Sequence, residues 1–390
     1  MKLIPVQPVP ESVYQKVGFY WYQTPETPPY IADELVVISA KEGDAYYRAA
    51  GELYDLFIAA GQHVIDHRLY EELDIPPALI PLIEETWDDE AHFHLVGRFD
   101  LAGGLDGQPI KLIEFNADTP SLIFEVALIQ WLLLRHNRLD EERQYNRLYE
   151  TLKESFTRIR KLHATTGEDD SPIPCALFSC LNLGTEDENT TRLLEEIAYE
   201  SGFITSFEYI EDVTFSEKTG IGNSEGEICD YWFKLVPYEL MASEEPELVE
   251  MLTTITGNRK TVLLNPPYTL LFQSKGLLKI LWDLFPHHPL LLETLREPLP
   301  GKSWVEKRTF GREGANISIL GPTGELLAST TGEYHNFQAV YQEFTELPRD
   351  STGKSYQAGV FFSYEPCGLG FRRERGIIQN FSQFIGHFVG

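Results

Sequence analysis

The stretch GRFDLAGGLDGQPIKLIEFNADTPSLIFE, residues 97–125, decides the fold that the sequence predicts. Two apolar runs, one around Phe99 and one from Ile110 to Phe115, flank a segment rich in glycine, aspartate and proline. That composition is typical of a turn between two paired strands. The stretch therefore predicts a β-hairpin at this point of the chain.

Polar side chains gather on one face of this hairpin. Glu114 and Asn116 lie two residues apart on one strand, so their side chains share a face at a spacing of roughly 6–7 Å. Asp100, on the facing strand, can join them. Carboxylate and amide oxygens are hard ligands of the kind that Mg²⁺ takes. The three residues are candidate metal ligands, although on spacing alone the solvated face of an exposed hairpin explains them more simply.

A helix is predicted directly after the hairpin. Thr119 has the side chain of an N-cap, Pro120 suits the first helical position, and the helix is expected to end near Asn137. Its free amides would face the same site, because helix N-termini favour anions.

A strand–helix–strand pattern follows further along the chain. CALFSCLNL (175–183) predicts a buried strand, Asn189 to Ser201 a helix and FITSFEYI (203–210) a second strand. This alternation is typical of a parallel sheet. Ligands of such sheets lie beyond the carboxyl ends of the strands, which places a site near residues 182–189.

Acidic residues occupy that place in the sequence. Glu186, Asp187 and Glu188 stand just at the start of the predicted helix. They either complement the positive end of the helix dipole or form a docking site for an amine. The sequence leaves both interpretations open.

A glycine-containing loop occurs in the C-terminal third. Trp304 to Lys307 predicts a strand, residues 311–314 a flexible loop, and Asn316 to Leu320 a strand that pairs back. Glycines let backbone amides approach a phosphate closely. An ordinary hairpin can use the same loop, but Lys307 just before it favours the nucleotide interpretation.

Several motifs together resemble one known family. RFD (98–100) and LIEFNADTPS (112–121), followed by Glu125, resemble the glutathionylspermidine synthase C-terminal domain family, a branch of the ATP-grasp ligases. Further stretches agree in the same order, namely LLFQSKGLLKILWDLFPHHPLLLETL (270–295), WVEKRTFGREGANISI (304–319), YQEFTELP (341–348) and GLGFRRERGIIQNFSQFIGHFV (368–389). The similarity runs from about residue 17 to the C-terminus and is to stand-alone relatives without an amidase domain.

The resemblance implies an α/β (α+β) fold. The metal-ligand stretch precedes the phosphate loop, whereas most ATP-grasp chains run in the other order, so a circularly permuted ATP-grasp fold is expected, with an additional βαβ lobe of the pre-ATP-grasp kind. The expected parts are a helical segment with the metal hairpin (1–164), the βαβ lobe (165–265) and the nucleotide-binding elements (266–390).

The resemblance also implies roles for individual residues. Asp100, Glu114 and Asn116 would hold two Mg²⁺ ions, with Glu114 shared between them. Arg98 and Arg372 would stabilise the charge at the reacting carboxylate and γ-phosphate.

Larger sets are implied for the nucleotide and the substrates. The residues expected to contact ATP are Lys275, Lys307, Gly311, Arg312, Gly314, Gln342 and Leu347. The substrate candidates are Thr119, Ser121 and Glu125 for the acid, and Glu186 and Asp187 for the amine. The chain departs from the family at Arg308, where a proline usually follows the phosphate-binding lysine.

The implied reaction is the ATP- and Mg²⁺-dependent formation of an amide from a carboxylate and an amine. The carboxylate would first take the γ-phosphoryl group, and phosphoryl transfer depends mainly on positioning and charge neutralisation. The acid is expected to be a small molecule or peptide such as glutathione, and the amine a polyamine. A phosphotransferase without ligation and a non-catalytic nucleotide-binding scaffold remain as alternatives.

Composition limits the partners. The chain has 390 residues, 43% of them hydrophobic, and a net charge of −28. That charge would repel nucleic acid and anionic membranes. The N-terminus lacks the apolar core of a signal peptide, and no apolar run reaches ~18 residues, so a cytoplasmic protein is expected. The oligomeric state stays open.

The cysteines carry a further expectation. Cys175, Cys180, Cys229 and Cys367 fit no CxxC or Cys/His zinc spacing. They are predicted to be reduced and mostly buried thiols.

Overall fold

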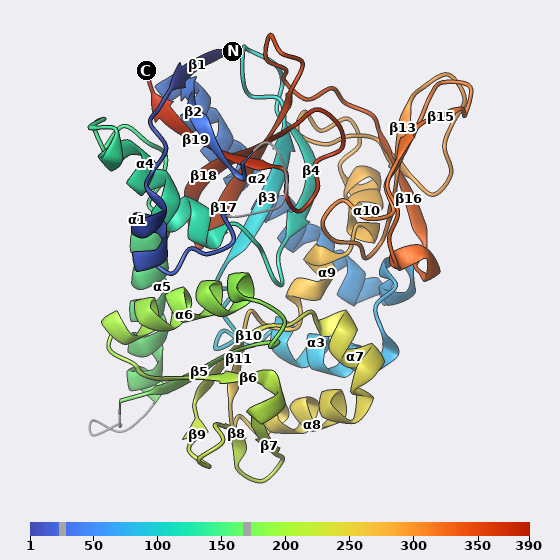
Figure 1. Ribbon diagram of the computed structural model, residues 1–390. Helices are drawn as coiled ribbons and strands as arrows, with labels where there is room; N and C mark the ends of the chain where they lie inside the picture. The colour runs from blue at the N-terminus through green and yellow to red at the C-terminus, as the bar shows by residue number, and fades with distance from the viewer. Residues whose placement is uncertain (23–28, 167–172) are drawn as a thin grey trace.

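Both ends of the chain contribute to one seven-stranded sheet, called here the large sheet. The computed structural model describes residues 1–22, 29–166 and 173–390 (Figure 1). Strands β2 and β19 are parallel, and the other neighbours are antiparallel. In spatial order the strands are β1 (Lys2–Pro5), β2 (Ile31–Ile38), β19 (Gln383–Val389), β18 (Glu365–Glu374), β17 (Ser355–Ser363), β3 (Gly97–Ala102) and β4 (Lys111–Asn116).

The predicted hairpin is confirmed as β3 and β4 of this sheet. Phe99 pairs with Phe115 and Asp100 with Glu114 in an antiparallel register. The two phenylalanine rings are buried and stacked, with centroids 3.8 Å apart, and Phe57 packs on Phe115 at 5.2 Å. Because side chains alternate along a strand, this burial turns Asp100 and Glu114 to the opposite face.

The long helix α2 (Ala40–His67) supplies the packing partner of the buried face. A capping box between Ser39 and Glu42 begins this helix, and Phe57 and Val64 are among its buried residues. The core on this side of the large sheet therefore forms between α2 and the hairpin.

The helix predicted to begin at Thr119 starts later, so its predicted N-cap is wrong. Leu122 is buried and has a φ of 69°, in the left-handed region, which a right-handed helix cannot include. Helical structure begins at Ile123, passes through a π-helical turn (Glu125–Ile129) and continues as α4 (Gln130–His136). The predicted end near Asn137 agrees with the structure.

The predicted parallel sheet is confirmed and forms a second lobe, at the bottom of Figure 1. A three-stranded antiparallel sheet and helices α7 (Tyr238–Glu244) and α8 (Pro246–Gly257) belong to the same segment. The order of the parallel sheet is β11 (Val262–Leu264), β10 (Tyr231–Leu235), β5 (Cys175–Cys180) and β6 (Ile204–Tyr209), and α6 (Thr185–Glu200) connects β5 to β6. The small antiparallel strands are β7 (Thr214–Ser216), β8 (Gly220–Gly222) and β9 (Ile228–Cys229).

A third, antiparallel sheet, called here the small sheet, lies at the upper right of Figure 1. The predicted strand–loop–strand unit is confirmed, since β13 pairs with β14 on either side of the loop formed by residues 311–314, the glycine loop. In spatial order the strands are β12 (Thr294–Leu295), β16 (Ala339–Glu343), β13 (Trp304–Arg308), β14 (Ser318–Leu320) and β15 (Leu326–Ser329).

Further helices, most of them short, connect these sheets. The N-terminal residues form β1 and the helix α1 (Glu11–Lys16). No described helix is long and apolar enough to cross a membrane. The other helices are α3 (Ile80–Trp87), α5 (Leu148–Thr166), α9 (Thr269–Gln273), α10 (Gly276–Leu284) and the 3₁₀ turns Tyr70–Leu73, Pro77–Leu79, Ile210–Asp212 and Tyr334–Asn336.

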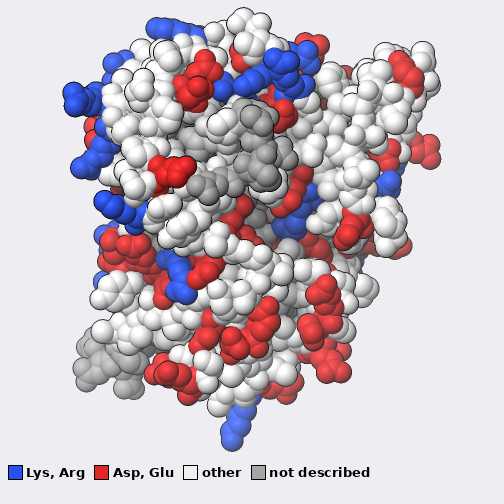
Figure 2. Space-filling view, viewed as in Figure 1, with Lys and Arg blue, Asp and Glu red and all other residues white. Residues whose placement is uncertain are grey.

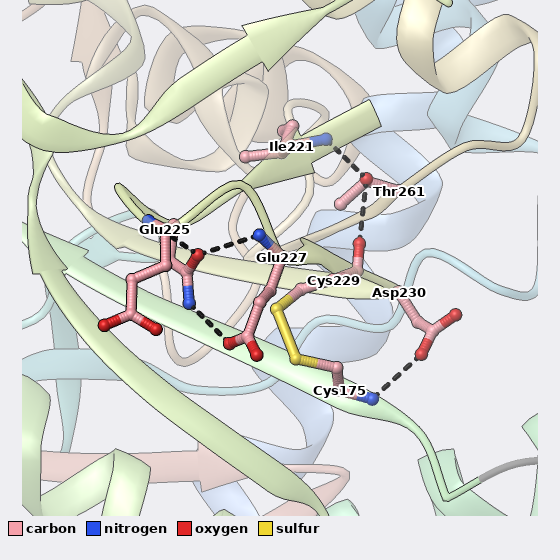
Figure 3. Close-up of a disulfide and its surroundings, with 8 residues drawn as sticks. Cys175, Ile221, Glu225, Glu227, Cys229, Asp230 and Thr261 are labelled. Atoms are coloured by element: carbon pink, nitrogen blue, oxygen red, sulfur yellow. Dashed lines mark hydrogen bonds between the residues drawn. A yellow bond between two sulfur atoms is a disulfide. The ribbon is translucent and has the colours of Figure 1, made fainter. Parts of the chain in front are cut away.

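The expectation of four reduced cysteines is wrong for two of them. Figure 3 shows Cys175 of β5 joined to Cys229 of β9 by a disulfide, with Cα atoms 4.7 Å apart. The Cys175 amide also donates to the Asp230 carboxylate at 2.8 Å. Cys180 and Cys367 are free and buried. The pairing depends on two strands that meet only in the folded lobe, so the spacing of the cysteines could not reveal it.

This disulfide should stabilise the parallel-sheet lobe. It closes a loop with a sequence separation of 54 residues, and the chain-entropy account gives about 4 kcal/mol for a loop of that length. We expect the Cys175→Ala/Cys229→Ala double variant to unfold at lower urea concentration than the oxidised wild type. Added reductant should shift the wild type toward the variant and leave the variant unchanged. Equal midpoints for the oxidised wild type and the variant would contradict this expectation.

Candidate active site

A cavity of about 620 Å³ opens between the large sheet, the small sheet and the parallel-sheet lobe. Its walls include the polar face of the β3–β4 hairpin, the glycine loop and the start of α6. Figure 2 shows that Asp and Glu side chains predominate among the charged residues on this side of the parallel-sheet lobe, in the lower half of the view. The three sheets therefore bring distant parts of the sequence to one place.

Nearly all of the predicted site residues meet in this cavity, and the exceptions are Glu125 and Glu188. The residues that line it are Arg98, Asp100, Glu114, Asn116, Thr119, Ser121, Glu186, Asp187, Lys275, Lys307, Gly311, Arg312, Gly314, Gln342, Leu347 and Arg372. Glu125 is buried behind the wall, where its carboxylate accepts hydrogen bonds from Trp21 Nε1 at 2.8 Å and Tyr30 Oη at 2.7 Å. The roles assigned to these residues stay predictions.

The candidate metal ligands form one polar cluster on the hairpin. Asp100 accepts from Arg98 at 2.6 and 3.0 Å and from Asn116 Nδ2 at 3.2 Å. Glu114 lies 3.3 Å from Lys275 Nζ. Two carboxylates and an amide oxygen on one sheet face are hard donors that suit Mg²⁺. No group of three or more His, Cys, Asp or Glu side chains is placed to hold a metal among the described residues, so the amide of Asn116 is needed to complete a set.

The charges around Glu114 keep it ionised. Burial alone would raise the pKa of Glu114, but Lys275, Lys307 and Arg98 outweigh burial and hold the pKa below its usual range. Burial lowers the pKa of Lys307 to about 8, with Lys275 acting in the same direction and Glu114 and Asp100 opposing it. An anionic ligand would add the negative charge that this lysine pair lacks.

The two lysines come from different elements and converge beside β4. Lys307 of β13 donates to the Ile113 carbonyl at 3.0 Å and to Gln342 Oε1 at 2.8 Å. Lys275, which immediately precedes α10, donates to the Gly311 carbonyl at 2.8 Å. The small sheet is thereby attached to the hairpin through side chains that line the cavity.

The glycine loop closes one side of the cavity. Gly314 has a φ of 71°, and a Cβ there would lie 2.4 Å from the Ile378 carbonyl oxygen, so only glycine fits. Arg312 pairs with Glu239 at 2.8 Å and donates to Thr119 Oγ1 at 2.5 Å. The loop therefore contacts the parallel-sheet lobe as well as the segment that follows the hairpin.

Both predicted arginines line the cavity. Arg98 Nη1 donates to the Ser121 carbonyl at 2.6 Å and to Ser121 Oγ at 3.0 Å. Arg372 is buried, donates to the Asn380 carbonyl, and has an Nε atom without a hydrogen-bond partner among the described residues. These guanidinium groups can orient a carboxylate or phosphate in the cavity.

Arg308, where the family usually has proline, leaves the strand intact. It pairs with Ala339 in the regular antiparallel register of β13 and β16, and its guanidinium contacts Glu306 at 3.0 Å. The register of β13 therefore stays regular up to Arg308.

Another part of the cavity wall is acidic. Burial raises the pKa of Glu186 to about 8, and Glu125, Asp187 and Glu313 add to the shift while Arg372 opposes it. Burial also raises the pKa of Asp187, with Glu313 as its acidic neighbour. Like charges held together in a partly desolvated place favour a bound cation.

Sequence reasoning missed several residues of the cavity. Gly359 of β17 pairs with Asp100, and Gln357 lies two residues before Gly359 on the same strand. Gln357 therefore faces the same side of the large sheet as Asp100 and lines the cavity. Glu313 and Arg375 line the cavity from two loops. A polar residue alternating with apolar ones, as in SYQAGVFF (355–362), was the available signal for Gln357.

Comparison with known proteins identifies the family. The whole chain, residues 1–390, matches the family described as glutathionylspermidine synthase preATP-grasp. A Haemophilus influenzae protein, provisionally named an acid–amine ligase, is 28% identical over 97% of both chains. The bifunctional glutathionylspermidine synthetase/amidase of Escherichia coli is 27% identical over 80% of this chain, which spans about half (52%) of that enzyme's length.

A solved structure agrees with the fold. The glutathione synthetase-like effector of Globodera pallida superposes with a TM-score of 0.53 at 12% identity, covering 91% of this chain and 89% of its own. The predicted fold class, a mixed α/β ATP-grasp fold, is confirmed, and so is the predicted enzyme class of acid–amine ligases. The chain belongs to the glutathionylspermidine synthase family.

The raised pKa of Glu186 predicts a pH-dependent stability. Because its folded pKa lies above its unfolded pKa, the folded protein holds the extra proton between these values. Its contribution is therefore present at acidic pH and is lost as the pH rises to about 8. We expect the free energy of unfolding of the wild type to fall from pH 5 to pH 8 relative to that of Glu186→Gln. Above pH 8 the pH profiles of the two proteins should run parallel.

Glu188→Gln provides the matched control for this measurement. Glu188 lies in the same helix, and a hydrogen bond from Arg192 lowers its pKa. Its removal should leave the wild-type trend between pH 5 and 8 in place. Urea titrations at a series of pH values measure both variants, and identical pH profiles for wild type and Glu186→Gln would refute the assignment.

Proposed function

We propose that the protein is an ATP- and Mg²⁺-dependent carboxylate–amine ligase that forms an amide through an acyl phosphate. The observation that carries this proposal is one cavity with a cationic end, an acidic end and a carboxylate cluster beside the cationic end. Cationic side chains suit a triphosphate, the carboxylate cluster suits the Mg²⁺ ions that accompany it, and acidic side chains suit an amine. The family and the names of the relatives support the same class of reaction.

The cationic end would bind the triphosphate. Lys275 and Lys307 are point charges that offset phosphate charge, and the glycine loop offers backbone amides nearby. Asp100, Glu114 and Asn116 would hold Mg²⁺ ions, which when bound neutralise phosphate charge and orient the γ-phosphate. Gln342 and Leu347 would line the rest of the nucleotide site.

The acid would lie between the phosphates and the segment after the hairpin. Arg98 and Arg372 would orient its carboxylate, and the hydroxyls of Thr119 and Ser121 stand next to them. A carboxylate oxygen attacks the γ-phosphorus, ADP leaves, and an acyl phosphate forms. The guanidinium groups stabilise the charge that develops during this transfer.

The amine would enter from the acidic end. An amine that is protonated in water is attracted by the acidic residues of this part of the cavity, and it must lose a proton to attack the acyl carbon. The bound cation would lower the pKa of Glu186 from about 8, so that its carboxylate is ionised near neutral pH and can accept that proton. Attack on the carbonyl carbon then expels inorganic phosphate and leaves the amide.

The direct experiment is ADP release with Mg²⁺ and ATP against a panel of acids crossed with amines. Glutathione and spermidine are the first pair to test, since the Escherichia coli relative is named for their product. A product lighter by one water than the sum of acid and amine supports the ligase. A phosphorylated single substrate would show a phosphotransferase instead, and ATP binding without turnover of any pair would show a scaffold.

Variants of the site give a second test. We expect Glu114→Gln and Lys307→Met to lower ADP release at least 100-fold, since each removes a charge from the place where phosphate charge is transferred. Lys279→Met is the control, because Lys279 pairs with Asp283 on the outside of α10. Circular dichroism should show all three variants folded, and turnover retained in Glu114→Gln and Lys307→Met would reject the assignment.

A further inference from the structure

An ion pair crosses from the glycine loop to the parallel-sheet lobe. Arg312 donates to Glu239 Oε1 through Nη2 at 2.8 Å and through Nε at 3.3 Å. The Glu239 side chain is 7% exposed and that of Arg312 22%. Neither the sequence nor the resemblance pointed to Glu239, which lies in the first turn of α7.

Glu239 is held in place by a buried ion pair beneath it. Lys234 Nζ donates to Asp118 Oδ1 at 2.6 Å, and both side chains are fully buried. The other oxygen of Asp118 accepts from the Tyr238 amide at 3.1 Å, one residue before Glu239. The start of α7 is therefore fixed to the segment that follows the metal-ligand hairpin.

Arg312 reaches that same segment directly. Its Nη1 donates to Thr119 Oγ1 at 2.5 Å, so one guanidinium links the loop to Glu239 and to the residue after Asp118. Both contacts to Glu239 fall on Oε1, and Oε2 is buried without a hydrogen-bond partner among the described residues. Oε2 can therefore accept a further hydrogen bond, so that the carboxylate and the Arg312 guanidinium can form a bidentate pair.

We propose that Glu239 is a positioning residue that acts through Arg312. It holds the glycine loop against Thr119. The loop then covers both the part of the cavity that would bind the phosphates and the part beside Thr119 that would bind the acid substrate. Part of this proposal rests on the proposed function, because closure matters to catalysis only if an acyl phosphate forms in the cavity. A closed loop excludes water from such an intermediate, which would otherwise hydrolyse before the amine attacks.

Trypsin measures the loop without reference to any activity. The enzyme cleaves after arginine, and in the folded protein Arg312 is occupied by Glu239 and Thr119. We expect cleavage after Arg312 to be at least fivefold faster in Glu239→Gln than in the wild type. Cleavage after Lys218, in the exposed turn between β7 and β8, is the internal reference and should not change.

Glu200→Gln is the matched control variant. Glu200 pairs with Lys153 at 2.7 Å between two helices of the same region, away from the cavity lining. It should cleave after Arg312 at the wild-type rate. If Glu239→Gln also cleaves at the wild-type rate with an unchanged melting temperature, the positioning role is refuted.

A second variant covers the case in which Glu239→Gln folds poorly. Arg312→Lys keeps the charge and the trypsin site but loses the fork, so it should also cleave faster at this position. Faster cleavage at residue 312 together with unchanged cleavage after Lys218 supports the proposal. Equal acceleration at both positions indicates general unfolding and counts against it.

The catalytic consequence is a change in coupling. With the acid and amine that the substrate panel identifies, the wild type should release one ADP per amide formed. We expect Glu239→Gln to release severalfold more ADP than amide, Glu239→Asp to restore part of the coupling, and Glu200→Gln to match the wild type. An unchanged ratio in Glu239→Gln would contradict the coupling step. If the wild type forms no amide, the proposed function fails while the trypsin comparison still decides the loop contact.

Discussion

The burial of Phe99 and Phe115 is the constraint on which the cavity depends. The two rings stack beneath α2, and alternation along β3 and β4 then places the polar residues of the hairpin on the opposite face. Strand β17 pairs with β3 on the other side, where a Cβ at Gly359 would lie 3.0 Å from Arg98 Cδ. The register that buries the aromatic core is thus the register that assembles the carboxylates.

Charges so close to a core must be compensated, and the compensation comes from other lobes. Glu114 is matched by Lys275 beside α10, and Arg312 of the glycine loop by Glu239 of the parallel-sheet lobe. Buried charges without a partner are costly, so these pairs also fix how the three sheets sit together. The acids around Glu186 are the exception, since burial and neighbouring acids raise their pKa values more than Arg372 and Arg312 lower them. That excess suits a cationic substrate.

The sequence predicted the parts that depend on local pattern. The hairpin, the parallel sheet and the strands around the glycine loop follow from alternation and turn residues, and nearly all of the residues that the family motifs singled out line the cavity. It could not predict contacts between distant segments, such as the Cys175–Cys229 bond or the parallel pairing of β2 with β19. Glu239 escaped for the same reason, because its partner lies 73 residues away in another lobe.

The failed helix start at Thr119 explains why the three lobes meet where they do. An N-cap would use the Thr119 hydroxyl on its own helix, but the left-handed Leu122 delays the helix and leaves residues 117–121 irregular. Side chains from elsewhere satisfy this segment instead: Gln273 accepts from the Ala117 and Asp118 amides, and Asn265 donates to both carbonyls. Arg98, Lys234 and Arg312 then each reach it from a different element. A regular helix would have formed its own backbone hydrogen bonds and left these side chains no backbone groups to bind. The departure from helical geometry therefore allows this one short segment to contact the hairpin, the parallel-sheet lobe and the glycine loop.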